Sequence, residues 1–157
     1  MIRLNQLIIP SLRAFSGPTR TIDSGLASLA DSGFSSENGC FFLTDLRGGS
    51  TNARLSDFPD RTGYECFVNH VHIDDFVTAE IMSQTLRFVW RVLHNWSPQN
   101  PNGPLISIAS ITDNNATVRF HLKRPNEEWL SAELDGFSEG LLEMSSLDLS
   151  FFSLFDR

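Results

Sequence analysis

The segment His70-x-His72-x-Asp74-Asp75 gathers the side chains best suited to chemistry in this sequence. On a β-strand, residues i and i+2 point to the same face, so the two imidazoles would lie side by side with carboxylates next to them. Such a group could bind a transition metal or supply a general base. No third or fourth ligand follows at a recognisable spacing, and the aspartates also suit a helix cap. A structural histidine pair is therefore the preferred interpretation, and a metal-assisted hydrolase centred on His70, His72 and Asp74 is the alternative.

Other catalytic motifs are missing from the sequence. It contains no G-x-S-x-G nucleophile elbow, no G-x-G-x-x-G loop and no Walker pattern. Its two cysteines, Cys40 and Cys66, lack CxxC or zinc-type spacing, and both stand in apolar runs. We therefore expect buried, reduced thiols, a reducing compartment and no cofactor. Whether Cys40 and Cys66 form a disulfide stays open.

The element that must position the histidines is predicted as a strand over residues 64–73 from its alternation, and apolar side chains on both faces indicate a central strand. A long amphipathic helix is predicted from Asp75 to Asn95, with apolar residues at three- and four-residue steps, and Ser97-Pro98 ends it. The aspartates at the start of this helix would accept hydrogen bonds from the free N–H groups of its first turn.

The remaining segments predict short strands around that helix. Before it we expect a strand in 2–13 that Pro10 stops, a short helix over 23–29, a strand over 39–46 and a long polar loop over 47–62. After it we expect antiparallel strands over 105–112, 117–123 and 128–134, then a fourth strand or a docking apolar segment within 140–155. In 117–123, His121 would point away from the apolar face. The sequence thus predicts one α+β domain, 1–157: an antiparallel sheet of about five to six strands packed on one long helix, with a short N-terminal helix.

The charge of the chain indicates the class of its partner. The formal net charge is −7, from 12 basic and 19 acidic side chains. Nucleic acid and anionic membrane surfaces are therefore disfavoured as ligands, because both attract basic proteins. The acids concentrate in residues 31–75 and 127–157, so we expect a basic protein partner, with plain solubility as the competing explanation. The candidate partner-binding residues are Asp57, Asp60, Glu127, Glu128, Asp135 and Glu139.

Two stretches carry a family resemblance: Gly63–Phe76 (GYECFVNHVHIDDF) and Glu128–Ser146 (EWLSAELDGFSEGLLEMSS). In a small acidic α+β domain without catalytic motifs, they resemble the bacterial immunity proteins of polymorphic-toxin and contact-dependent growth inhibition systems. The resemblance carries over no individual residue. It implies binding to a cognate toxin domain, often a nuclease with a basic cleft, and blocking of that domain by acidic side chains.

The leading hypothesis is therefore a non-enzymatic, cytoplasmic immunity protein that neutralises a toxin, with a nuclease as the expected toxin class. The alternatives are the metal-assisted hydrolase described above and a non-catalytic adaptor subunit that uses exposed aromatic side chains. The toxin, the acidic segment that contacts it and the oligomeric state stay open at this point.

Overall fold

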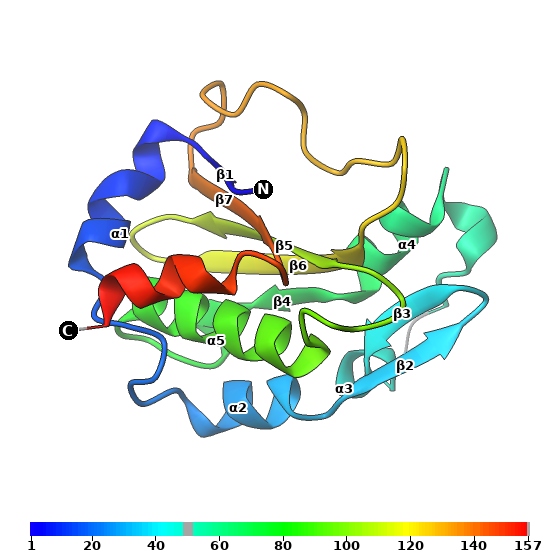
Figure 1. The fold of residues 1–157 in the computed structure, drawn as a ribbon, viewed down its shortest axis with the longest axis horizontal. Coiled ribbons are helices and arrows are strands. Elements are labelled where there is room, and N and C mark those ends of the chain that lie inside the picture. The colour runs from blue at the N-terminus through cyan, green and yellow to red at the C-terminus, as the bar shows by residue number, and fades with distance from the viewer. Residues whose placement is uncertain (49–51, 157) are drawn as a thin grey trace.

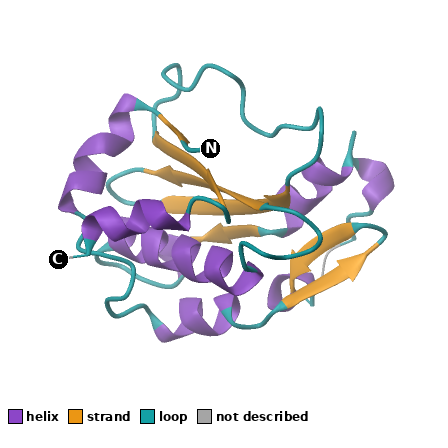
Figure 2. Cartoon of the chain, in the orientation of Figure 1, coloured by secondary structure: helices purple, strands orange, loops and turns teal. Residues whose placement is uncertain are grey.

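The computed structural model describes residues 1–48 and 52–156 (Figures 1 and 2). Its strands are β1 (Arg3–Leu4), β2 (Phe34–Glu37), β3 (Cys40–Leu43), β4 (His70–His72), β5 (Leu105–Ile111), β6 (Ala116–Leu122) and β7 (Gly140–Ser145). Its α-helices are α1 (Ile9–Ala14), α2 (Ser24–Ala30), α3 (Thr44–Arg47), α4 (Arg61–Val68) and α5 (Ile81–Trp96). Short 3-10 turns are η1 (Gln6–Ile8), η2 (Leu55–Asp57), η3 (Ile73–Asp75) and η4 (Leu149–Phe155). Within the described residues, no helix is both long and apolar enough to cross a membrane.

The main sheet has five strands in the order β1-β7-β5-β6-β4, and every neighbouring pair is antiparallel. A separate hairpin pairs β2 with β3. The α+β class and the antiparallel sheet are thus confirmed. β5 and β6 form the predicted hairpin, whose turn is closed by the N–H of Thr112, which donates to the carbonyl oxygen of Asn115 at 2.9 Å.

One face of the sheet forms the main hydrophobic core. Alternate residues of β5, β6 and β7 pack there against α5 and η4, because side chains along a strand alternate between faces. Phe120 of β6 meets Phe88 of α5 edge to face, with ring centroids 5.9 Å apart. Phe152 of η4 belongs to the same cluster. Each fully buried side chain of this size contributes about 1.5–3 kcal/mol to folding.

The opposite face of the sheet is more polar and is covered by an irregular segment, residues 123–139, which we call the strap. The strap connects β6 to β7 and arches over the sheet in yellow and orange (Figure 1). Its Leu130 and Leu134 pack on Ile106, Ile108 and Leu141 in a small second cluster. The strand predicted over 128–134 is therefore wrong. Two leucines four residues apart, and not alternate residues, face the sheet, so the segment lacks the two-residue period of a strand.

The segment around the histidines differs from the sequence prediction. Residues 61–68 form α4, and only His70–His72 form a strand. The side chain of Asp60 caps α4 by accepting from the Gly63 N–H at 2.7 Å. Six of the eight residues of α4 are buried, and a short, largely buried run of this kind does not distinguish helix from strand in the sequence.

The long helix is α5, which begins at Ile81 and not at Asp75. The predicted capping role of the aspartates is wrong, because Asp74 and Asp75 lie in η3. There the N–H groups of Phe76 and Val77 both donate to the Ile73 carbonyl oxygen, which closes a local turn. The predicted end of the helix at Ser97-Pro98 is confirmed.

The N-terminal predictions have mixed outcomes. The short helix over 23–29 is confirmed as α2, with the Asp23 carboxylate accepting from the Leu26 N–H at 3.0 Å. Pro10 does not stop a strand but stands in the first turn of α1, where its missing N–H costs nothing. The predicted loop 47–62 includes residues 49–51, which lie outside the described residues, and its remainder contains η2 and the start of α4.

Candidate functional site

The two histidines of the H-x-H segment do lie together. Their ring centroids on β4 are 4.5 Å apart, as the strand prediction requires. Burial, reinforced by the charge of Arg119 and by His72, lowers the pKa of His70 to about 4. The Asp74 carboxylate accepts from the Ala116 N–H at 3.3 Å. Among the described residues, no three His, Cys, Asp or Glu side chains are placed to hold one metal ion.

A buried ion pair fixes the beginning of the strap. The Arg124 guanidinium binds both oxygens of Glu65 on α4, with Nη1–Oε1 at 2.7 Å and Nη2–Oε2 at 2.8 Å. The Glu65 side chain is completely buried, and it also accepts from the N–H groups of Phe41 at 2.7 Å and Leu122 at 2.9 Å. One carboxylate therefore joins α4, β3, β6 and the strap. Burial acts to lower the pKa of Arg124, but the hydrogen bond and charge of Glu65 raise it overall.

A buried amide fixes the other end of the strap. Asn5, 2% exposed, donates through Nδ2 to the carbonyl oxygens of Leu134 at 3.2 Å and Glu139 at 2.9 Å. Its Oδ1 accepts from the Leu141 N–H at 2.9 Å. The strap is thus held at both ends by side chains from elsewhere in the chain, although it has no regular secondary structure.

The structure divides the six predicted partner-binding residues into two groups. Asp60 and Glu127 both bind the first turn of α4. Asp60 accepts from the Gly63 N–H at 2.7 Å, and Glu127 Oε1 accepts from the Thr62 N–H at 3.3 Å. Asp57, which accepts from the Arg54 N–H, and the exposed Glu128 are their neighbours in sequence. At the far end of the strap, Asp135 accepts from the Gln6 N–H and Glu139 from the Ser138 hydroxyl. The two acidic stretches therefore meet at α4, while the remaining two acids lie apart.

Exposed aromatic side chains lie beside this junction. The Trp129 ring, 43% exposed, stacks on the Arg119 guanidinium, whose carbon is 5.0 Å from the ring centroid. Arg119 in turn donates to the Cys66 carbonyl oxygen in α4 at 2.9 Å. The next residue, Phe67, is 51% exposed, and its ring centroid is 5.4 Å from that of Phe58. Cation–π stacking holds Trp129 in place although much of the residue stays exposed to water.

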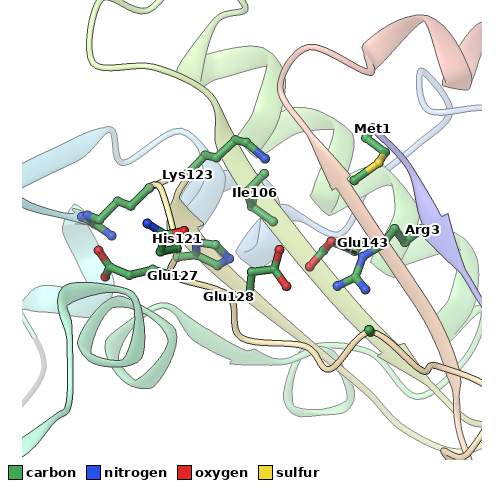
Figure 3. A pocket seen from close by; sticks show the side chains of 11 residues that line it. Met1, Arg3, Ile106, His121, Lys123, Glu127, Glu128 and Glu143 are labelled. Atoms are coloured by element: carbon green, nitrogen blue, oxygen red, sulfur yellow. Dashed lines mark hydrogen bonds and ion pairs between the residues drawn. The ribbon is translucent and has the colours of Figure 1, made fainter.

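A cavity of about 460 Å³ separates the strap from the sheet beside β1 (Figure 3). Its polar lining includes Arg3, His121, Lys123, Glu127, Glu128 and Glu143. Arg3 and Glu143 are paired, with Nε–Oε1 at 2.8 Å. Of the Glu127 and Glu128 carboxylates, that of Glu128 lies between the His121 ring and the Arg3–Glu143 pair (Figure 3).

His121 is the buried titratable group of this cavity. It is 3% exposed, its Nδ1 lies 2.9 Å from the Leu122 carbonyl oxygen, and its Nε2 has no hydrogen-bond partner among the described residues. Because a carbonyl oxygen only accepts, Nδ1 carries the proton and Nε2 of the neutral ring offers a lone pair. Burial lowers the pKa of His121, which favours this neutral form. The strand alternation correctly predicts that His121 points away from the apolar core, but the sequence predicts a strand over 128–134 where the strap covers His121.

Comparison with known proteins gives a family without an activity. The profile of the Uncharacterized protein PM0498 family matches residues 3–153. The "Uncharacterized protein PM0498" of Pasteurella multocida (strain Pm70) is 26% identical over 155 residues, which cover 90% of this chain and 97% of that protein. No solved structure matches the chain.

Proposed function

The chain belongs to the Uncharacterized protein PM0498 family, and we propose from its acidic surface that it is an immunity protein that binds and neutralises a cognate toxin domain, in the first instance a nuclease. Its binding surface is the junction of α4 with the strap, around Asp57, Asp60, Glu127, Glu128 and the aromatic Trp129. The observation that supports this most is the hydrogen bond from the Thr62 N–H to Glu127, 65 residues along the chain, which joins the two acidic stretches.

The chemistry of this surface suits a basic protein. Asp60 and Glu127 each bind a backbone N–H through one oxygen, so their positions are set before a partner arrives. A preorganised surface loses less conformational entropy on binding. Trp129 adds a large anchor of a residue type enriched in binding hot spots. Carboxylates around it would speed encounter with a positively charged cleft and disfavour other partners.

The cytoplasm is the proposed compartment, because a nuclease toxin would have to be stopped where it meets nucleic acid. The proposed mechanism is occlusion: the acidic surface occupies the basic cleft that the toxin needs for phosphate. This mechanism needs neither a cofactor nor a catalytic group. The hydrolase alternative depends on a metal at His70 and His72, for which no third ligand stands nearby among the described residues.

The test is a search of the neighbouring genes for a toxin-like domain, followed by binding to that domain, with the association rate measured by stopped flow at increasing salt. We expect the rate to fall steeply as salt is added. Glu128→Lys should lower the association rate by about fivefold, equivalent to about 1 kcal/mol. Asp113→Lys is the matched control, because Asp113 is exposed in the turn at the opposite end of β6 and the charge change is the same.

Co-expression provides the functional measurement. Cells that produce the toxin domain should survive with the wild-type chain and lose part of that protection with Glu128→Lys. Failure of the wild-type chain to protect, or an association rate that does not respond to salt, would refute the proposal. An equal effect of the two charge reversals would place the binding surface elsewhere on the molecule.

A further inference from the structure

We infer that the cavity under the strap is a binding site for a guanidinium group, supplied by an arginine side chain of the protein partner. The inference takes the source of the arginine from the proposed function, but the site itself is argued from its own lining. It would turn a general acidic surface into one with a defined recognition point at His121 and Glu128.

The first argument is the unused acceptor on His121. Buried polar atoms nearly always have a hydrogen-bond partner, and an orphan acceptor is costly. Here the Nε2 atom of a 3% exposed side chain lines the cavity and has no partner among the described residues. Since its Nδ1–H is directed to the Leu122 carbonyl oxygen, Nε2 can only accept while the ring is neutral. The group that completes this site must therefore carry an N–H or O–H donor.

The second argument is the charge of the lining. Arg124 is neutralised by Glu65, which lies outside the cavity lining, and Arg3 is neutralised by Glu143. The ammonium group of Met1 is neutralised by Asp148, which also lies outside the lining. Beyond these pairs the lining carries the carboxylates of Glu127 and Glu128 and the ammonium group of Lys123. The Glu128 carboxylate makes no hydrogen bond within the described part of the chain and lies between the His121 ring and the Arg3–Glu143 pair (Figure 3), where its charge also acts on Arg3. A lone pair beside a free carboxylate selects a cationic donor.

The third argument is shape. A guanidinium is planar and offers five N–H donors in a fixed fork, so it can bind a carboxylate and a ring nitrogen at once. An ammonium group is a compact, strongly hydrated charge and satisfies such a pair less well. The volume of about 460 Å³ lies within the range of pockets that enclose small ligands, which leaves room for an arginine side chain. A metal ion is a poorer occupant, because no described group of three ligands could hold it.

The test uses the whole protein with ¹⁵N-labelled histidine and follows the His121 Nε2 resonance by NMR near pH 7.5. The probe is N-acetyl-L-arginine methylamide, and N-acetyl-L-citrulline methylamide is its neutral match. We expect the arginine probe to shift the Nε2 resonance in the direction of an accepted hydrogen bond, in a saturable manner. The citrulline probe should bind at least about tenfold more weakly, because it retains donors but lacks the charge.

Two shape-preserving variants locate the site. Glu128→Gln should weaken binding of the arginine probe by about fivefold to tenfold, because it removes the free carboxylate. Glu133→Gln is the matched control on the strap, since Glu133 does not line the cavity, and it should leave binding unchanged. Both side chains are exposed, so neither variant threatens the fold.

Several outcomes would overturn the inference. Equal binding of the arginine and citrulline probes would remove the role of charge, and tighter binding of a lysine probe would exclude guanidinium selectivity. A shift with inorganic phosphate alone would identify an anion site, and no shift with any probe would mean a solvent-filled cavity. Toxin binding without an arginine response would refute this site and leave the proposed function standing. An arginine response without toxin binding would support this site and refute the proposed function.

Discussion

Replacing Glu65 by glutamine should destabilise the protein far more than the loss of one charge at the surface. The carboxylate accepts four hydrogen bonds: Oε1 from Arg124 Nη1 and the Leu122 N–H, and Oε2 from Arg124 Nη2 and the Phe41 N–H. In Glu65→Gln one oxygen becomes an NH₂ group. Whichever way the amide turns, that group faces two donors and accepts from neither.

The size of the effect follows from burial. Removing one partner of a buried ion pair typically costs about 3–5 kcal/mol, because the other charge is left uncompensated. The Arg124 side chain is 12% exposed and keeps some contact with water, so we take about 3 kcal/mol. For a domain of this length each kcal/mol lowers Tm by about 2–4 °C, which predicts a fall of about 6–12 °C.

The assay is urea unfolding followed by circular dichroism, together with a thermal melt. The matched control is Glu37→Gln, which breaks the exposed pair between Arg47 and Glu37, where the Glu37 side chain is 51% exposed. Such surface pairs contribute about 0–1 kcal/mol. In the double variant Glu65→Gln/Arg124→Gln, the loss should be less than the sum of the two single losses, because no buried charge remains. A Glu65→Gln protein within 1 kcal/mol of wild type, or additive single losses, would refute the reasoning.

Three further predictions concern other buried positions. Burial raises the pKa of the thiols of Cys40 and Cys66, that of Cys66 to about 12, so a thiol reagent at pH 8 should label neither in the native protein and both in guanidinium. Burial lowers the pKa of His70 to about 4, whereas an unfolded histidine has a pKa of about 6.5. Between these pH values only the unfolded state takes up the proton, so the unfolding free energy should fall as the pH drops, less steeply in His70→Asn; identical slopes in urea titrations would contradict this. Gly140→Ala would place its Cβ 3.2 Å from the backbone of η1 and should cost about 1–3 kcal/mol. Gly136→Ala, with no atom within 4 Å of its Cβ, is the neutral control for the same melt.

The parts of the fold that could be predicted from the sequence are those with local causes. The hairpin of β5 and β6 has clear alternation and a polar turn, and Ser97-Pro98 breaks the helical backbone whatever lies around it. Asp23 caps α2 through an N–H three residues along the chain. Each of these signals involves neighbouring residues only.

The candidate site could not be predicted in the same way, because its causes are distant in sequence. In the sequence, Glu65 occupies one polar position of the predicted strand. In the structure it lies in a helix, and its buried carboxylate is paired with Arg124, 59 residues away. The sequence analysis assigns Asp60 only to the acidic surface, although its place three residues before Gly63 is also a helix-start signal. His121 faced the expected side of its strand, but its burial depends on the strap, which the sequence predicted as a strand.

The arrangement of the strap explains why a polar sheet face could persist in this fold. Burying Arg3, Glu143 and His121 contributes less stability than aliphatic side chains would, and the orphan Nε2 of His121 is a direct cost. The strap is nevertheless anchored, by Arg124 at one end and Asn5 at the other, while Glu128 and Trp129 between them stay exposed. The buried anchors thus hold an exposed segment in one conformation. On the proposed function this gives two separable classes of variant: changes at Glu128 alter the encounter with the partner, and changes at the anchors weaken the complex by loosening the strap. An anchor variant that bound the partner with wild-type association and dissociation rates would show that the anchors do not preorganise the strap.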